Sequence, residues 1–330
     1  MGGKCVNFRR LFLDNPRKMW RDAAVITVSL VAIFLAGPLF INNQSLFMEL
    51  AIFIILAESL NIVYGFTGYL PFGFGVFFAV GAYGAAILIH NYSWPVSASI
   101  IAGACFSALL SLLFTPMLRL SGAYFAISSL AAFEAVYYIF SNTQPQIVAL
   151  TGGPYGISFT QVYNPNLDFT IAVIISIVSA LVVLLISNST FGIALKAIRE
   201  DRFAVELAGV SSLRYRTYAW LITAFISGIA GGLFGWYLGF FYPETVFDLT
   251  DFSVLVIVFL LAGGRGTVYG PLIGTVILFL GYELISLYFA NLLLIIFGVI
   301  LVLLVLFLPR GLEPLFRKLV AFMTQPSGGS

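Results

Sequence analysis

The sequence predicts an all-α membrane protein with about ten transmembrane helices, and three observations support this. Of the 330 residues, 61% are hydrophobic and only 9% are charged, whereas a soluble domain carries roughly 25% charged residues. Long apolar runs recur along the chain, and most approach the roughly 20 residues that a helix needs to cross the hydrocarbon core. The runs show no alternation with a period of two residues, which excludes the strands of a membrane barrel.

Each apolar run is expected to form one membrane-spanning helix. The eighth run is short. The helices can begin or end a few residues beyond each run, because flanking residues of mixed polarity can extend a helix. The runs cover residues 23–40, 47–64, 70–89, 96–117, 122–140, 169–187, 217–241, 253–263, 269–288 and 292–309.

The distribution of Lys and Arg supports this count and predicts the orientation. With ten spans and both termini in the cytoplasm, all 16 basic residues fall on the cytoplasmic side of a plasma membrane. A count that differed by one span would scatter them over both faces. The chain therefore divides into a cytoplasmic N-terminal segment (1–22), a transmembrane domain (23–312) and a cytoplasmic tail (313–330). The N-terminal segment is expected to lie in the lipid interface, and a solvated tail is the alternative.

The predicted cytoplasmic loop 188–216 concentrates the charge that the rest of the chain avoids. Six of the eleven residues from Lys196 to Glu206 are charged, and small apolar residues recur among them at spacings of three and four. This periodicity predicts a short amphipathic helix, with Gly209 as its C-cap. Such a helix can insert into a groove on a soluble protein. The alternative, a helix lying on anionic headgroups, is disfavoured by its acidic residues.

Several function classes are excluded or unsupported by the motifs that the sequence lacks. It contains no G-x-x-x-x-G-K-[ST], no H-E-x-x-H and no G-x-S-x-G, and it has one histidine. We therefore expect no catalytic residues, no metal site and no cofactor. The formal net charge of +2 gives no reason to expect nucleic acid as a partner.

Acidic residues fall within the predicted spans, among them Glu58, Glu134 and Glu283. Ionisable groups inside a membrane are functional candidates, so a secondary transporter that couples to protons through Glu134 stays open. Against this alternative, no basic residue falls within a predicted span, and we expect no acidic cluster.

Glycine is abundant and patterned. Glycines repeat every fourth residue at 231, 235 and 239 and again at 266, 270 and 274, a spacing that lets helix backbones approach closely. The stretch PFGFG (71–75) combines one proline with two glycines. It predicts a helix break, and breaks at membrane depth commonly line a pathway.

The loop sequence FGIALKAIREDRFAVELAGV (191–210) resembles the cytoplasmic coupling segment of ABC-importer permeases of the branched-chain amino-acid type, in the LivM-like branch. Further stretches resemble the family in the expected order, and together they span roughly residues 50–312. They are GFTGYLPFGFGVFFAVGAYGAAIL (65–88), LRLSGAYFAISSLAAFE (118–134), LTGGPYGI (150–157), GGRGTVYGPLIGTVIL (263–278) and FLPRGL (307–312). Where the family often has L-S-L-G, this chain has Leu70, Pro71, Phe72 and Gly73, so a hydroxyl is missing. The sequence also has Asp201 where asparagine is common.

The resemblance implies a transport subunit that takes up branched-chain or other neutral amino acids by alternating access. Urea, short amides or another small solute are alternative substrates. It also implies four partners: a second, LivH-like permease, two ATPase subunits and an extracytoplasmic binding protein. The implied ATPase-coupling residues are Lys196, Arg199, Glu200, Asp201, Arg202, Ala204 and Gly209.

Two further groups of residues follow from the resemblance. The implied translocation pathway contains Pro71, Gly73, Gly75, Tyr83 and Glu134. The extracytoplasmic loop 142–168 is expected to receive the binding protein, or only to shape the vestibule as an ordered turn. Its candidate contacts are Gly152, Gly153, Pro154 and Gly156.

Overall fold

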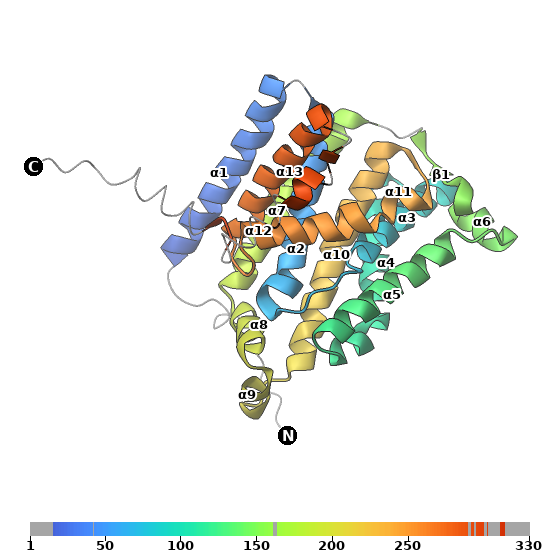
Figure 1. Ribbon diagram of the computed structural model, residues 1–330. Coiled ribbons are helices and arrows are strands. Elements are labelled where there is room, and N and C mark those ends of the chain that lie inside the picture. Colours follow the sequence, from blue (N-terminus) through green and yellow to red (C-terminus); the bar gives the residue numbers. More distant parts are fainter. Residues whose placement is uncertain are drawn as a thin grey trace, which may run out of the picture.

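The computed structural model describes residues 16–41, 43–160, 164–289, 292–293, 295–299, 302 and 311–313. Within these residues, nine helical segments are long and apolar enough to cross a membrane, which confirms the all-α architecture (Figure 1). They match the first nine predicted spans. The predicted tenth span, the N-terminal segment and the C-terminal tail lie largely outside the described residues. The nine are Met19–Pro38, Gln44–Gly65, Gly75–Tyr92, Val96–Leu113, Ala123–Phe140, Pro165–Ser187, Ser212–Leu238, Pro243–Gly263 and Tyr269–Phe289.

Several spans begin at different residues from those predicted, and four of the differences are instructive. Helix α3 (Gly75–Tyr92) starts only at the last residue of the PFGFG stretch, five residues late. Helices α7 (Pro165–Ser187) and α10 (Ser212–Leu238) start four and five residues early. Polar first turns hide these starts from a hydropathy reading; in α7 the Asn164 side chain accepts a hydrogen bond from Leu167 N (3.3 Å). The short eighth span continues backwards through the π-helix η6 (Thr250–Leu255) and α11 (Pro243–Val246) before α12 (Val256–Gly263).

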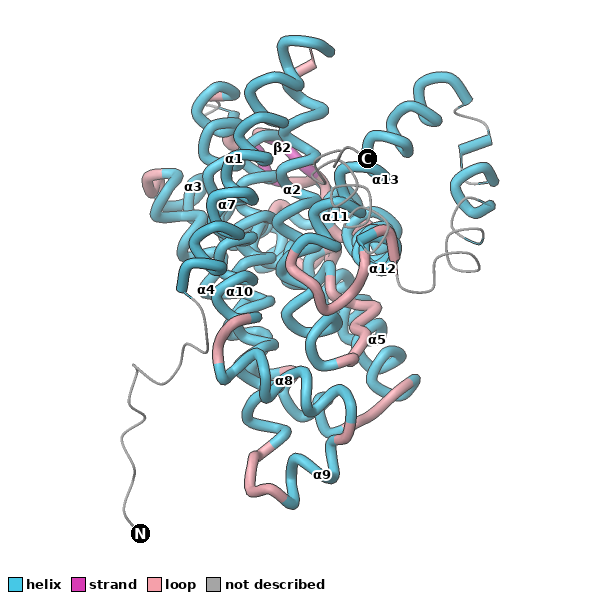
Figure 2. Tube along the Cα trace, turned by 90° about the vertical axis from the view of Figure 1, so that its left-hand side faces the viewer, coloured by secondary structure: helices cyan, strands magenta, loops and turns pink. Residues whose placement is uncertain are grey.

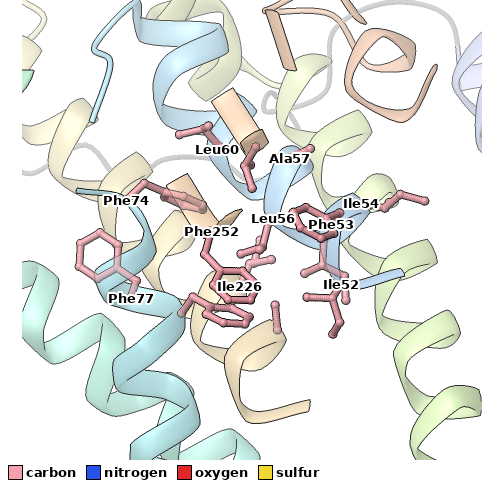
Figure 3. Close-up of a cluster of buried hydrophobic side chains, with 14 of the residues drawn as sticks. Ile52, Phe53, Ile54, Leu56, Ala57, Leu60, Phe74, Phe77, Ile226 and Phe252 are labelled. Atoms are coloured by element: carbon pink, nitrogen blue, oxygen red, sulfur yellow. The ribbon is translucent and has the colours of Figure 1, made fainter. Parts of the chain in front are cut away.

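Helix α2 (Gln44–Leu60) lies at the centre of the bundle, and it is buried on every side over most of its length. It packs against α7, α10, α12 and α13 (Tyr269–Phe289). Figure 3 shows Phe53 and Leu56 of α2 beside Phe74, Ile226 and Phe252 from three other segments. A helix that is apolar all round needs such a central place, because it has no face to offer to water.

Helices α3, α4 (Val96–Leu113) and α10 pack backbone to backbone. A Cβ atom added to Gly81 of α3 would collide with the backbone of Gly228 in α10, and one added to Gly103 of α4 would lie 2.5 Å from the carbonyl oxygen of Gly81. The predicted role of glycine in close helix packing is therefore confirmed for this trio.

Gly81→Val is expected to destabilise the bundle, because the new side chain forces α3 and α10 apart. Overpacking of this kind costs about 1–3 kcal/mol or more, which thermal unfolding of the detergent-solubilised protein would show as a lower midpoint. Gly281→Val in α13 is the matched control, because an added Cβ there meets no atom within 4 Å. Equal midpoints for the two variants would contradict the packing described.

The two ends of the bundle carry different structures. Helices α8 (Thr190–Glu200) and α9 (Arg202–Leu207) project at one end, as two perpendicular views show (Figures 1 and 2). Helix α10 leads from this end to the other, where β2 (Phe240–Phe241) pairs antiparallel with β1 (Ile157–Ser158). Helix α5 (Ala123–Phe140) also runs towards the strand end and is followed there by α6 (Pro145–Thr151).

Candidate functional site

The charged loop folds as two short helices, whereas the sequence predicted one. The break falls at Asp201, whose backbone is extended (φ −151°). Its carboxylate oxygen Oδ1 accepts hydrogen bonds from Phe203 N (2.9 Å) and Ala204 N (3.1 Å), so Asp201 is the N-cap of α9. Asn is an equally good N-cap, which gives the departure from the family pattern at this position a physical reason.

Gly209 ends α9, as the sequence predicted. Its φ of +86° follows the capping residue Ala208. Val210 N donates to Val205 O (3.2 Å) and Gly209 N donates to Glu206 O (3.0 Å). This pair of hydrogen bonds is the Schellman motif. Both ends of α9 are therefore capped, which fixes a helix of only six residues.

Two of the predicted coupling residues reach back into the membrane domain. Lys196 Nζ donates to Ser187 Oγ (2.8 Å) and lies 4.9 Å from the centre of the Phe66 ring. Burial and the neighbouring Arg199 lower the pKa of Lys196. Arg199 Nη1 donates to Gly65 O (2.8 Å). These two cations therefore join α8 to the membrane domain, whereas Glu200 stays exposed.

Arg199 lies in a cradle formed by Gly65, Gly68 and Gly266. A Cβ atom added to Gly68 would lie 3.0 Å from Arg199 Cγ, and one added to Gly266 would lie 2.5 Å from Nη1. Both glycines also have positive φ angles, of +77° and +78°, which larger residues rarely adopt. The cradle therefore accommodates the guanidinium only because these positions lack side chains.

The cradle is part of a hydrogen-bonded junction that the sequence did not reveal. At the end of α2 the chain forms a π-helix, η2 (Asn61–Gly65), a conformation that is frequent at functional sites. Asn61 Nδ2 donates to Thr267 O (2.7 Å), and Asn61 Oδ1 accepts from Gly266 N (2.9 Å). Asn61 thus hydrogen-bonds the connection between α12 and α13 to η2, and Arg199 hydrogen-bonds α8 to Gly65 of η2.

The PFGFG stretch breaks the helix, as predicted. Residues 68–74, here named the break loop, are not helical, and α3 begins at Gly75. Gly73 N donates to Ser129 Oγ of α5 (3.3 Å), and Gly75 N donates to Ser253 Oγ of η6 (2.8 Å). Side chains of neighbouring helices thus satisfy the freed backbone groups, as a break at membrane depth requires.

An open pocket of about 650 Å³ lies beside the break loop. Its wall combines the break loop and the first half of α5 with the side chains of Tyr64 and Arg265. Arg265 Nη1 donates to Tyr64 Oη (3.1 Å). Gly122, which immediately precedes α5, also lines the pocket.

A buried arginine lies behind this pocket, although the sequence predicted no basic residue within a span. Because α10 begins at Ser212, Arg216 falls inside the helix and is only 2% exposed. Its guanidinium lies 4.2 Å from the centre of the Tyr69 ring and has no hydrogen-bond partner among the described residues. Tyr69 also interacts with Arg202 of α9. Tyr69 therefore connects the pocket with the two short helices.

The other predicted pathway residues are spread out. Pro71 is buried in the break loop, but Tyr83 lies about two turns further along α3, where its ring packs against Phe140 and Phe241. Glu134 is half-buried on α5 and makes no hydrogen bond or ion pair with the part of the chain that the structure describes. The structure thus gathers the residues of PFGFG but not Tyr83 or Glu134.

The remaining acidic residues differ from expectation. Glu58 is fully buried, and neither carboxylate oxygen has a hydrogen-bond partner among the described residues. Glu49, Asp251 and Glu283 lie near enough to one another to interact electrostatically. The sequence did not bring these three residues together, because Asp251 precedes the predicted eighth span (253–263) and joins it only through its backward extension in η6.

At the strand end, the predicted outer loop is largely structured, with α6, the 3₁₀ turn η4 (Gly153–Tyr155) and β1. Gly152, Gly153 and Gly156 all have positive φ angles and form an ordered turn. Pro154 is exposed, and the neighbouring Tyr155 is 74% exposed. Tyr155 was not among the predicted contacts, because the resemblance in this loop rests on its glycines and not on an aromatic residue.

Sequence reasoning also missed the apolar residues of α9. Phe203 is 76% exposed and Leu207 is 91% exposed, and their spacing of four residues places them on one face of the helix. The sequence did contain a signal for this apolar face, namely two large apolar residues in an otherwise charged segment. Together, these features define a polytopic helical membrane protein with a broken helix and an exposed, capped segment at one end.

Residues 43–306 match the family model described as branched-chain amino acid transport system / permease component, and the chain belongs to this family. It is similar to the high-affinity branched-chain amino acid transport system permease proteins LivM of Salmonella typhimurium and of Escherichia coli. Each is 30% identical, with 88% of this chain and 75% of the relative covered. A probable branched-chain amino acid transport permease protein LivH of Methanocaldococcus jannaschii is 26% identical, over 72% of this chain and 78% of the relative. No solved structure matches the chain.

Proposed function

We propose that this chain is a transmembrane subunit of an ABC importer that moves branched-chain or other neutral amino acids into a prokaryotic cell by alternating access. It pairs with a second, LivH-like permease. Two ATPase subunits bind its cytoplasmic face and supply the energy, and an extracytoplasmic protein delivers the substrate. Both termini lie in the cytoplasm. The family and its relatives support the substrate class.

The single observation that carries this proposal is the coupling segment, defined here as residues 189–210. It presents Phe203 and Leu207 as apolar anchors, and Arg202 Nε donates to Glu206 Oε1 (3.0 Å) beside them. Apolar anchors with a polar rim are the usual composition of a protein interface. Such a surface suits the docking of a soluble partner subunit.

The same segment has a route into the membrane domain. Arg199 connects α8 with the junction at η2, and Tyr69 connects α9 with the break loop. Closure of the ATPases would displace the coupling segment as a rigid body. Arg199 would transmit the displacement to η2, and Tyr69 would transmit it to the break loop. The movement of these two segments would open the pathway alternately to the outside and to the cytoplasm.

The alternatives are not equally supported. Urea, short amides or another small solute fit the same architecture, because substrate choice rests largely with the binding protein. For a proton-coupled transporter, Glu134 would have to be the central group. Its half-buried place on α5, away from the junction, gives that reading no support.

A mild-detergent pull-down of this chain from its native host, followed by mass spectrometry, tests the proposal. We expect a second permease and two nucleotide-binding subunits to be recovered, and ATP-dependent uptake of leucine in proteoliposomes that contain them. Recovery of this chain alone, with proton-dependent uptake, would refute the proposal.

Asp201→Ala is expected to weaken α9 by about 0.5–2 kcal/mol, because two backbone amides lose their acceptor. The fraying helix would position Phe203 poorly, so leucine uptake and ATPase recovery should both fall. Asp201→Asn is the matched control and should retain both. A similar loss in the two variants would show that charge, and not capping, is the property that matters.

A further inference from the structure

The pocket beside the break loop combines a cation with apolar walls. Of the side chains that line it, Arg265 is the charged one, and Leu70, Phe72, Ile127 and Leu130 contribute aliphatic and aromatic surface. A volume of about 650 Å³ lies within the range of small-molecule sites, roughly 300–1,000 Å³. The pocket therefore suits a small molecule with one anionic group and an apolar tail.

The hydrogen bonds leave donors available for that anion. Arg265 is exposed and gives one N–H to Tyr64, so its other N–H groups are not used within the described residues. Tyr64 Oη accepts from Arg265, which leaves its own proton to donate. A carboxylate between these two groups would receive charge-assisted hydrogen bonds from a planar guanidinium, which suits its geometry. The start of α5, which lines the same pocket without a side-chain cap, adds a favourable dipole.

We propose that this pocket is a substrate subsite inside the permease, in which Arg265 and Tyr64 bind the carboxylate of a neutral aliphatic amino acid and the apolar wall receives its side chain. This rests on the proposed function and names how the permease itself holds its substrate. No acidic side chain lines the pocket within the described residues. The carboxylate therefore dominates recognition over the ammonium group, and a second positive charge on the substrate is disfavoured by Arg265.

Photolabelling of the whole complex tests the subsite. The complex in proteoliposomes is irradiated with a leucine analogue that carries a diazirine on its side chain, and labelled peptides are mapped by mass spectrometry. We expect label on the break loop and on the first half of α5. Excess leucine and 4-methylpentanoate, which keeps the carboxylate without the amine, should compete. Isoamylamine, which keeps the amine without the carboxylate, should not.

Variants of Arg265 test whether labelling of the pocket depends on binding of the substrate carboxylate. Arg265→Gln should lower labelling of the pocket about tenfold, the expected effect of losing a charge-assisted bond, whereas Arg265→Lys should retain much of it. Arg119→Gln removes an exposed cation outside the pocket and should leave labelling unchanged. Equal competition by isoamylamine, or full labelling of Arg265→Gln, would overturn the subsite.

Uptake of leucine by the same proteoliposomes separates this proposal from the proposed function. Wild-type uptake with label only outside the pocket would refute the subsite and leave the permease function intact. Absence of uptake by the wild-type complex would refute the proposed function, and the subsite with it.

Discussion

Replacing Phe203 and Leu207 together by aspartate is expected to release the ATPase subunits from this permease. Both side chains are largely exposed on a helix that is capped at each end. An apolar anchor of an interface commonly contributes about 2 kcal/mol or more, and the two new carboxylates would be buried without partners. We expect binding to weaken on the order of a hundredfold or more, measured as the recovery of ATPase subunits from detergent extracts.

Tyr155→Asp is the control at the opposite end of the bundle. Tyr155 is also a large exposed residue on an ordered turn, but the proposed function places it outside the cell. Its variant should retain the ATPase subunits and lose stimulation of ATP hydrolysis by the binding protein. If the double α9 variant copurifies with the ATPases as well as the wild type does, the assignment of the docking surface is wrong.

Arg199→Gln is expected to separate ATP hydrolysis from transport. The shorter, neutral side chain cannot donate to Gly65 O from within the glycine cradle, so α8 loses its bond to η2. A hydrogen bond from a charged group contributes roughly 1.5–3 kcal/mol, so we expect uptake to fall about tenfold or more. The ATPase subunits should still copurify and hydrolyse ATP, because Phe203 and Leu207 are untouched.

Arg119→Gln is the control. Arg119 is an exposed arginine that lies outside the coupling segment, so the same change of charge there leaves the bond to η2 intact. Uptake by this variant should remain near the wild-type rate. Normal uptake by Arg199→Gln would show that the motion enters the membrane domain elsewhere, for example through Tyr69.

Composition and periodicity were enough to predict most of the architecture. The hydrocarbon core of a bilayer requires each spanning helix to be about 20 residues long and mostly apolar. The first nine spans could therefore be predicted from hydropathy alone. Local backbone conformation could also be predicted from the sequence. Gly209 ends its helix and PFGFG breaks one, because glycine and proline act through the backbone regardless of tertiary context.

The direction in which side chains point could not be predicted from the sequence in the same way. Lys196 and Arg199 looked like a charged surface, yet they reach into the membrane domain because glycines there leave room for them. Arg216 is buried because α10 starts inside the charged loop. The helix break at Asp201 depends on a competition between capping and helix continuation that hydrophobic periodicity does not register.

Cysteine crosslinking within the intact complex tests the central claim most directly, namely that α9 docks an ATPase. Cys5 and Cys105 are first replaced by serine, and Phe203→Cys or Tyr155→Cys is introduced. A short bifunctional thiol reagent is then applied to complexes whose ATPases carry a cysteine in the groove facing the permease. We expect a crosslink from position 203 to an ATPase subunit and none from position 155. A crosslink from position 155 to an ATPase, or its absence at 203 in a complex that transports leucine, would contradict it.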